Sequence, residues 1–294
     1  MRRVVVTGAN KGIGLAIATA ILEEHADTYV LLGARSAERG RAALESLTQQ
    51  RAAWTERASV LELDVTSDAS VEAAAAQVAE RFGRTPAPLY GLVNNAGVSG
   101  GVGLGLTLDV NTRGVRRVCE AFLPLLDASQ GRIVTITSAA GPSYVSRCSP
   151  ERQRFFLGRG VALRELEALM AECLAIQGDE AAFAARGLGN GDAYGLSKAC
   201  ANTYTLLLAR EHPQLRINAC TPGFIETDMT RGYVNSQGKT PAELGMKPPA
   251  AGARAPMFLL FGELEGNGRY YGSDAQRSPL DRYRSPGDPP YSGE

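Results

Sequence analysis

Residues 4–14 read VVVTGANKGIG, and this stretch decides the fold. A short β-branched run leads into a turn with glycines at positions 8, 12 and 14, and the following LAIATAIL (residues 15–22) favours a helix. Glycines at this spacing permit a tight turn and a close approach of backbone to a pyrophosphate, which a helix N-terminus stabilises. The stretch therefore predicts a dinucleotide site between the first strand and the first helix.

The same alternation continues along the chain. Short apolar runs bounded by turns are separated by longer helical stretches, which favours right-handed crossovers and a parallel sheet. We expect an α/β fold with a Rossmann-type doubly wound parallel sheet, in which residues 1–273 form a single domain. The predicted strands cover residues 4–7, 29–32, 59–63, 89–93, 132–137 and 215–220, and the predicted helices cover 15–22, 36–50, 67–82, 106–126 and 194–211.

The alternation breaks after residue 138. Residues 141–192 contain helical patterns but no strand pattern, so we expect a helical insertion there. One helix should open at Ser149, a capping residue followed by Pro150, and another should run over 161–177. Residues 274–294 are rich in Pro, Gly, Asp and Arg, and they predict a C-terminal tail that lies on the surface or is partly disordered.

Composition excludes several classes of protein. The 31 basic and 31 acidic residues balance, whereas a nucleic-acid-binding protein would be basic. No apolar run reaches the length of a membrane span, and the run after Met1 is too short for a signal peptide. The five cysteines are scattered without metal-ligand spacing, so we expect no metal site and a reducing compartment, the cytoplasm.

Motifs further along the chain occur in a recognisable order. The glycine turn has GxxxGxG spacing, and it is followed by Asn94-Asn95-Ala96-Gly97, by Ser138, by Tyr194 and Lys198 four positions apart, and by Pro222-Gly223. This order resembles the short-chain dehydrogenase/reductase family over roughly residues 3–273. The resemblance implies an oxidoreductase that uses a nicotinamide cofactor.

The resemblance also implies a catalytic set of four residues: Asn111, Ser138, Tyr194 and Lys198. Reduction of a carbonyl group needs a hydride at carbon and a proton at oxygen, and Tyr194 is the expected general acid. Lys198 lies one helical turn away, and its charge, together with the positive charge of the oxidised nicotinamide, should lower the pKa of the tyrosine. Ser138 should hold the carbonyl oxygen, and Asn111 should support a water-linked proton relay to the lysine.

The cofactor is expected to be NADPH/NADP+. Where NAD-preferring relatives carry an acid after the second strand, this chain has Arg35, and Lys11 adds a second cation for a 2′-phosphate. Asp64 and Val65 resemble the family's adenine contacts. The remaining expected cofactor-binding residues are Gly8, Asn10, Gly12, Ile13, Gly14, Asn94, Ala96, Gly97, Tyr194, Lys198, Pro222, Gly223, Ile225 and Thr227.

Ser138 and Tyr194 are 56 positions apart, and this long separation resembles the branch of monomeric carbonyl reductases and salutaridine reductases. We therefore expect a monomer that reduces a ketone, aldehyde or quinone to an alcohol, with no nucleic-acid or membrane partner. The substrate should lie between the insertion, the glycine-rich stretch after Gly97 and the loop 224–249. Two alternatives stay open: a dedicated biosynthetic ketoreductase or alcohol dehydrogenase, and a protein that binds NADPH for regulation without turnover. Cys220 is expected to be buried and inert, with redox sensitivity as the alternative.

Overall fold

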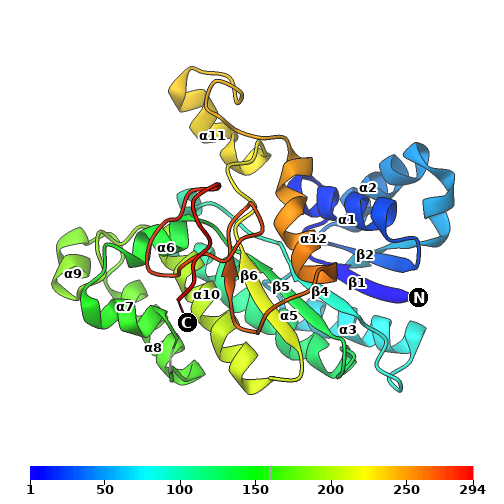
Figure 1. Cartoon of the computed structure of the whole chain (residues 1–294), viewed down its shortest axis with the longest axis horizontal. Coiled ribbons are helices and arrows are strands. Elements are labelled where there is room, and N and C mark those ends of the chain that lie inside the picture. The colour runs from blue at the N-terminus through cyan, green and yellow to red at the C-terminus, as the bar shows by residue number, and fades with distance from the viewer. Residues whose placement is uncertain (159, 294) are drawn as a thin grey trace.

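The computed structural model describes residues 1–158 and 160–293, and a parallel sheet runs through its centre (Figure 1). Its strands lie in the order β3-β2-β1-β4-β5-β6-β7, so the chain winds one way from β1 and the other way from β4. This confirms the predicted doubly wound sheet and places a ligand crevice at the carboxyl ends of β1 and β4, where the order reverses. The strands are β1 (Arg2–Val6), β2 (Thr28–Ala34), β3 (Ala58–Glu62), β4 (Gly91–Asn94), β5 (Arg132–Ile136), β6 (Arg216–Cys220) and β7 (Tyr270–Tyr271).

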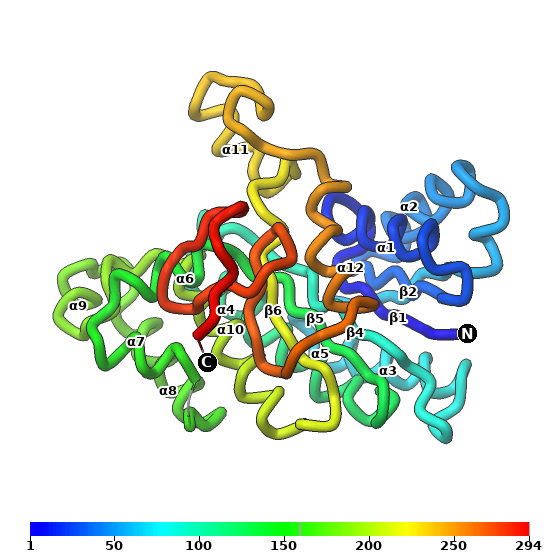
Figure 2. Tube along the Cα trace, viewed as in Figure 1, coloured from blue at the N-terminus to red at the C-terminus, as the bar shows by residue number. Residues whose placement is uncertain are grey.

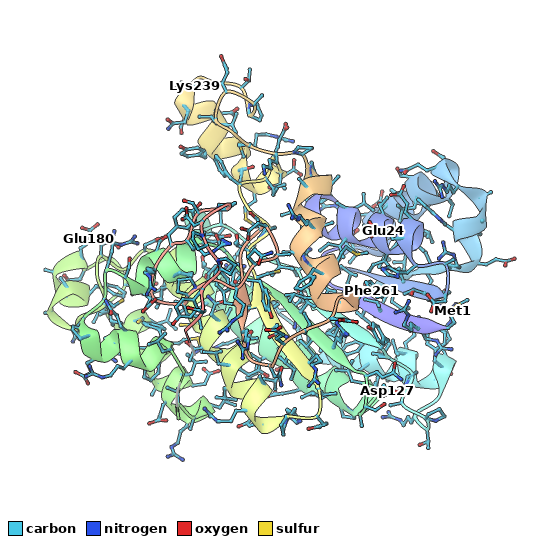
Figure 3. The ribbon with its side chains drawn as sticks, in the orientation of Figure 1. Met1, Glu24, Asp127, Glu180, Lys239 and Phe261 are labelled. Atoms are coloured by element: carbon cyan, nitrogen blue, oxygen red, sulfur yellow. The ribbon has the colours of Figure 1, made fainter. Side chains whose placement is uncertain are left out.

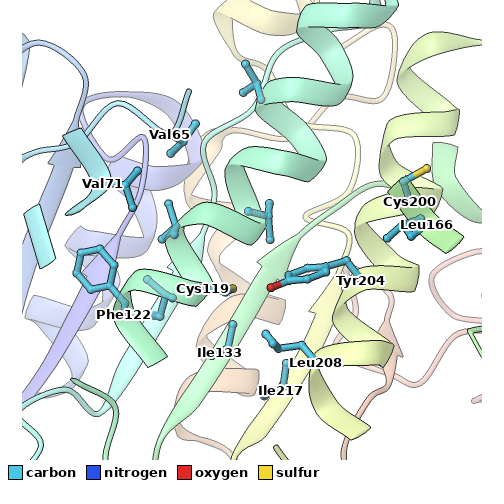
Figure 4. Packing of buried hydrophobic residues seen from close by; sticks show 14 of the residues in the cluster. Val65, Val71, Cys119, Phe122, Ile133, Leu166, Cys200, Tyr204, Leu208 and Ile217 are labelled. Atoms are coloured by element: carbon cyan, nitrogen blue, oxygen red, sulfur yellow. The ribbon is translucent and has the colours of Figure 1, made fainter. Parts of the chain in front are cut away.

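Helices cover both faces of the sheet because successive side chains of a strand point to opposite faces. In β1, Val4 and Val6 pack in one buried cluster, and Val5 packs in the other. Figure 4 shows part of the cluster that contains Val5, where Tyr204 and Leu208 lie against Ile133 and Ile217 of the sheet. No helix in the described part of the chain is both long and apolar enough to span a bilayer. The helices on the two faces are α1 (Gly12–Glu24), α2 (Ala37–Gln50), α3 (Asp68–Phe82), α5 (Gly114–Phe122), α10 (Ala193–Glu211) and α12 (Arg254–Phe261), with short 3-10 turns at Ala52–Glu56 and Pro249–Ala253.

The helix predicted over 106–126 is interrupted. The structure has a 3-10 turn at Gly100–Val102, then α4 (Leu104–Leu108), a π-helical turn at Asp109–Arg113, α5 and a 3-10 turn at Leu123–Leu125. A π turn adds a residue to the helical repeat and redirects the side chains that follow it, and such turns are frequent at functional sites. Asn111 lies in its centre.

Between β5 and α10 the structure places four helices, α6 (Ala140–Val145), α7 (Pro150–Phe156), α8 (Leu163–Ala175) and α9 (Glu180–Ala185). Helices α7 and α8 correspond to the two that the sequence predicts; Ser149 caps α7 by accepting a hydrogen bond from the Arg152 amide. Helices α6 and α9 were missed because each has six residues, too few to show an amphipathic repeat. Residue 159 of this stretch lies outside the described residues.

Two segments after β6 surround the carboxyl edge of the sheet. Helix α11 (Asp228–Gln237) projects from the body, with every residue at least partly exposed, and Lys239 lies at the outer end of this projection (Figures 1 and 3). The chain after β7 folds back over the region of α6 (Figure 2), so of the two expectations for the tail its described part follows the first, a surface position. Residue 294, the last of the predicted tail, lies outside the described residues.

Candidate active site

Close packing around the glycine turn between β1 and α1 leaves no room for a side chain at Gly8 or Gly14. Gly8 and Gly12 have positive φ angles, +63° and +56°, which favour glycine. A Cβ at Gly8 would lie 3.0 Å from the Ala96 Cα, and a Cβ at Gly14 would clash with the Gly8 carbonyl oxygen and the Asn95 side chain. The turn therefore requires glycine and packs tightly at the N-terminus of α1, where the sequence predicts that the pyrophosphate of the cofactor binds.

Asn95 holds this turn in place, although the sequence analysis gave it no role. Its Nδ2 donates to the carbonyl oxygens of Thr7 (2.9 Å) and Gly8 (3.2 Å), and the Thr7 hydroxyl accepts from the amides of Asn95 and Ala96. Asn94, which was predicted to contact the cofactor, is buried in the core and donates from Nδ2 to Cys119 Sγ at 3.2 Å. The second asparagine of the Asn94-Asn95 pair was the signal in the sequence for a residue that holds the turn.

The two cations expected at a 2′-phosphate differ in their surroundings. Arg35 is exposed directly after β2, whose end is joined to the glycine turn by the bond from the Ala9 amide to the Gly33 carbonyl oxygen. Lys11 is exposed too, but its Nζ lies 2.7 Å from a carboxylate oxygen of Asp228 at the start of α11. Asp228 thus has a lowered pKa, through its hydrogen bond and ion pair with Lys11. Of the two cations, Arg35 has no hydrogen-bond or ion-pair partner for its side chain within residues 1–158 and 160–293, so it is free to meet a phosphate.

The residues predicted near the adenine have local partners. Asp64 Oδ1 accepts from the amide and hydroxyl of Thr66, at 3.0 and 2.7 Å, and so fixes the turn after β3. Val65 is buried and packs against Gly114, where a Cβ would lie 3.0 Å from Val65 Cγ2. These contacts position the turn beside the cofactor crevice.

Tyr194, Lys198 and Ser138 come together at the carboxyl end of β5. Asp192 caps α10 by accepting from the Tyr194 amide (3.2 Å), which sets the first turn of the helix. Lys198 Nζ lies 5.6 Å from the centre of the Tyr194 ring and donates to the Ile136 carbonyl oxygen at 3.2 Å. Ser138, two residues further on, is close enough for its side chain to influence the pKa of Tyr194. The structure therefore gathers three of the four predicted catalytic residues around one phenol.

Burial controls how these groups titrate. It raises the pKa of Tyr194, and the hydrogen bond with Ser138 offsets part of that rise. It lowers the pKa of Lys198 to about 8. In the chain alone desolvation outweighs the other influences on the phenol, and a lowering of its pKa by Lys198 together with the oxidised nicotinamide stays a prediction.

Asn111, the fourth residue, is fully buried and held by three hydrogen bonds. Its Oδ1 accepts from the Val98 amide and its Nδ2 donates to the Val98 carbonyl oxygen, both at 2.9 Å, and to Ser197 Oγ at 3.0 Å. A Cβ at Gly97 would lie 3.2 Å from Asn111 Oδ1 and 3.5 Å from Lys198 Nζ. The side chain thus ties the segment after Gly97 to α10 and ends close to the lysine.

The loop after β6 closes the other side of the crevice. Gly223 has φ +95° and packs against Ser273, and Ile225 is buried. Thr227 begins α11 and lies opposite the glycine turn, since a Cβ at Gly12 would be 3.5 Å from Thr227 Cγ2. These residues therefore face the predicted cofactor site.

The cysteines of the chain are free and buried. Burial raises the pKa of Cys220 far above the range where a thiolate forms, although the residue ends β6 beside the site. This agrees with the expectation of an inert side chain.

Comparison with known proteins places this geometry in a family. The sequence profile of the family described as short chain dehydrogenase matches residues 2–150. Carbonyl reductase (NADPH) 1 of Sus scrofa is 32% identical over 273 residues, which cover 88% of this chain and 86% of that protein. The (+)-neomenthol dehydrogenase of Arabidopsis thaliana is 32% identical over 257 residues, with coverages of 78% and 84%. Among solved structures, salutaridine reductase from Papaver somniferum superposes with a TM-score of 0.75 at 26% identity, over 92% of this chain and 99% of that one. The chain therefore belongs to the short-chain dehydrogenase/reductase family.

Proposed function

We propose that this protein is an NADPH-dependent carbonyl reductase that converts a ketone, aldehyde or quinone to the alcohol. One observation carries the proposal: the Tyr194 phenol lies near Ser138 and Lys198, at the same edge of the sheet as the glycine turn. A nucleotide cofactor on that turn and a proton donor at that phenol are the two parts that carbonyl reduction requires.

The residues present fit NADPH. The cradle at Gly8, Gly12 and Gly14 would hold the pyrophosphate, and Arg35 would bind the 2′-phosphate after β2. When bound, NADPH supplies the hydride. The name of the Sus scrofa carbonyl reductase, which includes NADPH, supports this choice.

The chain supplies the proton. Burial raises the pKa of Tyr194, so the phenol is protonated at neutral pH and can donate to the carbonyl oxygen as negative charge develops there. Ser138 donates a second hydrogen bond to the same oxygen, and a protonated Lys198 stabilises the phenolate that is left. Asn111 fixes the segment after Gly97, which forms one wall of the crevice.

A second candidate is a dedicated ketoreductase or alcohol dehydrogenase. The relative named neomenthol dehydrogenase favours it, because its identity to this chain equals that of the carbonyl reductase. The two candidates share the same chemistry and differ in how many substrates are accepted.

The test is NADPH oxidation, followed at 340 nm, over a panel of quinones, aldehydes and ketones. We expect turnover of several members by the first candidate and of one member by the second. Tight NADPH binding without turnover of any member would contradict both and would favour a regulatory protein.

Arg35→Asp should weaken NADPH binding about 10- to 100-fold and NADH binding much less, because a guanidinium–phosphate bond is replaced by a repulsion. Calorimetric titration of both cofactors measures the effect. Arg41→Asp, an exposed residue within α2, makes the same change of net charge and should leave both affinities unchanged. Equal losses for NADPH and NADH in Arg35→Asp would remove the case for a 2′-phosphate contact.

We also propose that the protein is a monomer in the cytoplasm. Helices α7 and α8 cover α10, where Thr203 donates to the Phe156 carbonyl oxygen and Arg210 donates to that of Val161. That face of α10 is therefore already occupied within the chain. Sedimentation equilibrium should give a mass near 31.1 kDa, and a tetramer would contradict the proposal.

A further inference from the structure

Two glycines bring bare backbone against the first turn of α10, which carries Tyr194. A Cβ at Gly195 would lie 2.9 Å from the Tyr144 Cβ and 3.1 Å from the Ala140 carbonyl oxygen, so this turn packs tightly on α6. A Cβ at Gly100 would lie 3.1 Å from the Tyr194 nitrogen and 3.3 Å from its Cβ. The first turn of α10 is therefore in close contact with both α6 and the 3-10 turn that Gly100 begins.

This 3-10 turn is anchored on both sides of Gly100. Val98, two positions earlier, exchanges two hydrogen bonds of 2.9 Å with the side chain of Asn111. On the other side, the Gly103 amide donates to the Gly100 carbonyl oxygen at 3.2 Å, and the buried Thr107 hydroxyl donates to that of Gly103 at 2.6 Å. The turn therefore cannot move away from α10 without breaking one of these bonds.

The backbone of Tyr194 is anchored as well. Its amide donates to Asp192 Oδ1 at 3.2 Å, and its carbonyl oxygen accepts from the Ser197 hydroxyl at 2.8 Å. The same hydroxyl accepts from Asn111 Nδ2 at 3.0 Å, so Asn111 is bonded both to the segment of the 3-10 turn and to the helix of the tyrosine. The Cβ of Tyr194 bears the ring directly, and its position therefore determines where the phenol lies.

Backbone conformation does not explain the glycine at position 100. Gly100 and the next residue, Gly101, have φ angles that other residues adopt, in contrast to Gly103 at +87°. The two positions differ in their surroundings, because the nearest atom to a Cβ at Gly101 among the described residues is Ser99 Oγ, at 3.9 Å. A side chain therefore fits at position 101, whereas at position 100 it meets the backbone of Tyr194.

We propose that Gly100 is a positioning residue for Tyr194, because the missing side chain lets the 3-10 turn and α10 pack together at the distance that places the phenol. The inference rests on the proposed function, since it concerns the proton that Tyr194 donates. A methyl group at position 100 would displace the Tyr194 nitrogen and Cβ by a few tenths of an ångström. Reaction rates fall steeply when a reacting group is misplaced.

The test compares Gly100→Ala with Gly101→Ala in the full-length protein, with saturating NADPH and the best substrate of the panel. The kcat of Gly100→Ala should be about tenfold lower than that of Gly101→Ala. Both variants add one methyl group to the same turn, so any effect on substrate entry is common to them, and their KM and their Kd for NADPH should be similar. Equal kcat values would overturn the proposal.

A spectroscopic measurement tests the position of the phenol without turnover. In protein labelled with 3-fluorotyrosine, the fluorine resonance of Tyr194 is the one that Tyr194→Phe lacks. This resonance should shift in Gly100→Ala and stay in place in Gly101→Ala. A resonance that does not move in Gly100→Ala, or that moves equally in both variants, would overturn the proposal.

Two further outcomes are distinguishable. If the wild type turns over no member of the panel, the proposed function fails, and the fluorine resonance alone decides whether Gly100 positions Tyr194. Urea unfolding should give similar midpoints for Gly100→Ala and Gly101→Ala. A Gly100→Ala protein that does not fold would show that the contact supports the whole fold, and this result would overturn a role confined to the tyrosine.

Discussion

Tyr194→Phe is expected to lower kcat/KM for carbonyl reduction by about 10²- to 10⁴-fold, the usual contribution of a positioned general acid. The ring stays in place, so packing is kept and only the proton donor is lost. The Kd of NADPH should change much less than kcat/KM, because the ring, which is also an expected cofactor contact, stays in place. Steady-state rates with the best substrate of the panel, combined with a fluorescence titration of NADPH, measure both quantities.

Tyr204→Phe is the matched control. Tyr204 lies on the same helix, is buried, and packs in the core near Cys119 and Ile133 (Figure 4). The Tyr204→Phe substitution removes the same hydroxyl group at a position outside the crevice. The kcat/KM of this variant should therefore equal that of the wild type. Turnover that survives in Tyr194→Phe, or that is lost equally in Tyr204→Phe, would refute Tyr194 as the acid.

The features that the sequence predicted are those in which one short stretch carries the whole signal. The glycine turn needs only its own backbone angles and the strand and helix on either side. Tyr194 and Lys198 share a helix face through their spacing of four, so their proximity follows from helical geometry. The alternation of strands and helices likewise predicts right-handed crossovers and a parallel sheet.

The features that escaped prediction depend on contacts between distant segments. The π turn at Asn111 accompanies bonds from its side chain to Val98 and to Ser197, which is 86 positions away. Lys11 was predicted as a phosphate contact, but its partner Asp228 follows 217 positions later. The two-residue strand β7 is held by hydrogen bonds to β6 and to the segment that follows it. Neither β7 nor that segment therefore shows a sequence pattern of its own.

Lys198→Met is expected to stabilise the protein while it lowers the rate of reduction. Burial lowers the pKa of Lys198 from 10.5 to about 8, so the folded state disfavours the charged amine. Between those two values the unfolded chain binds more protons, and the free energy of unfolding rises with pH. Below pH 8 the cost of charging is present in full, and it amounts to about 3 kcal/mol. Loss of the hydrogen bond to the Ile136 carbonyl oxygen offsets about 1 kcal/mol of the gain.

Urea unfolding of the wild type and Lys198→Met at pH 7 and pH 10 measures this balance. The variant should be more stable by about 1–3 kcal/mol at pH 7, and the difference should shrink at pH 10, where the folded wild-type amine is neutral. Lys239→Met removes an exposed lysine at the end of the α11 projection and should change neither value (Figure 3). A Lys198→Met protein that is less stable than the wild type at pH 7 would mean that the fold stabilises the charge.

The same pKa sets the pH dependence of the reaction. In the proposed mechanism the charge of Lys198 stabilises the phenolate formed when Tyr194 gives up its proton, so kcat/KM for reduction should fall as pH rises above about 8. Lys198 therefore lowers the free energy of unfolding at pH 7 and supports the reaction at the same pH. Both effects come from one ammonium group that is buried away from water. A kcat/KM that stays constant from pH 7 to pH 10 would show that the charge of Lys198 affects stability without affecting the rate. Lys198 would then have no electrostatic role in proton transfer.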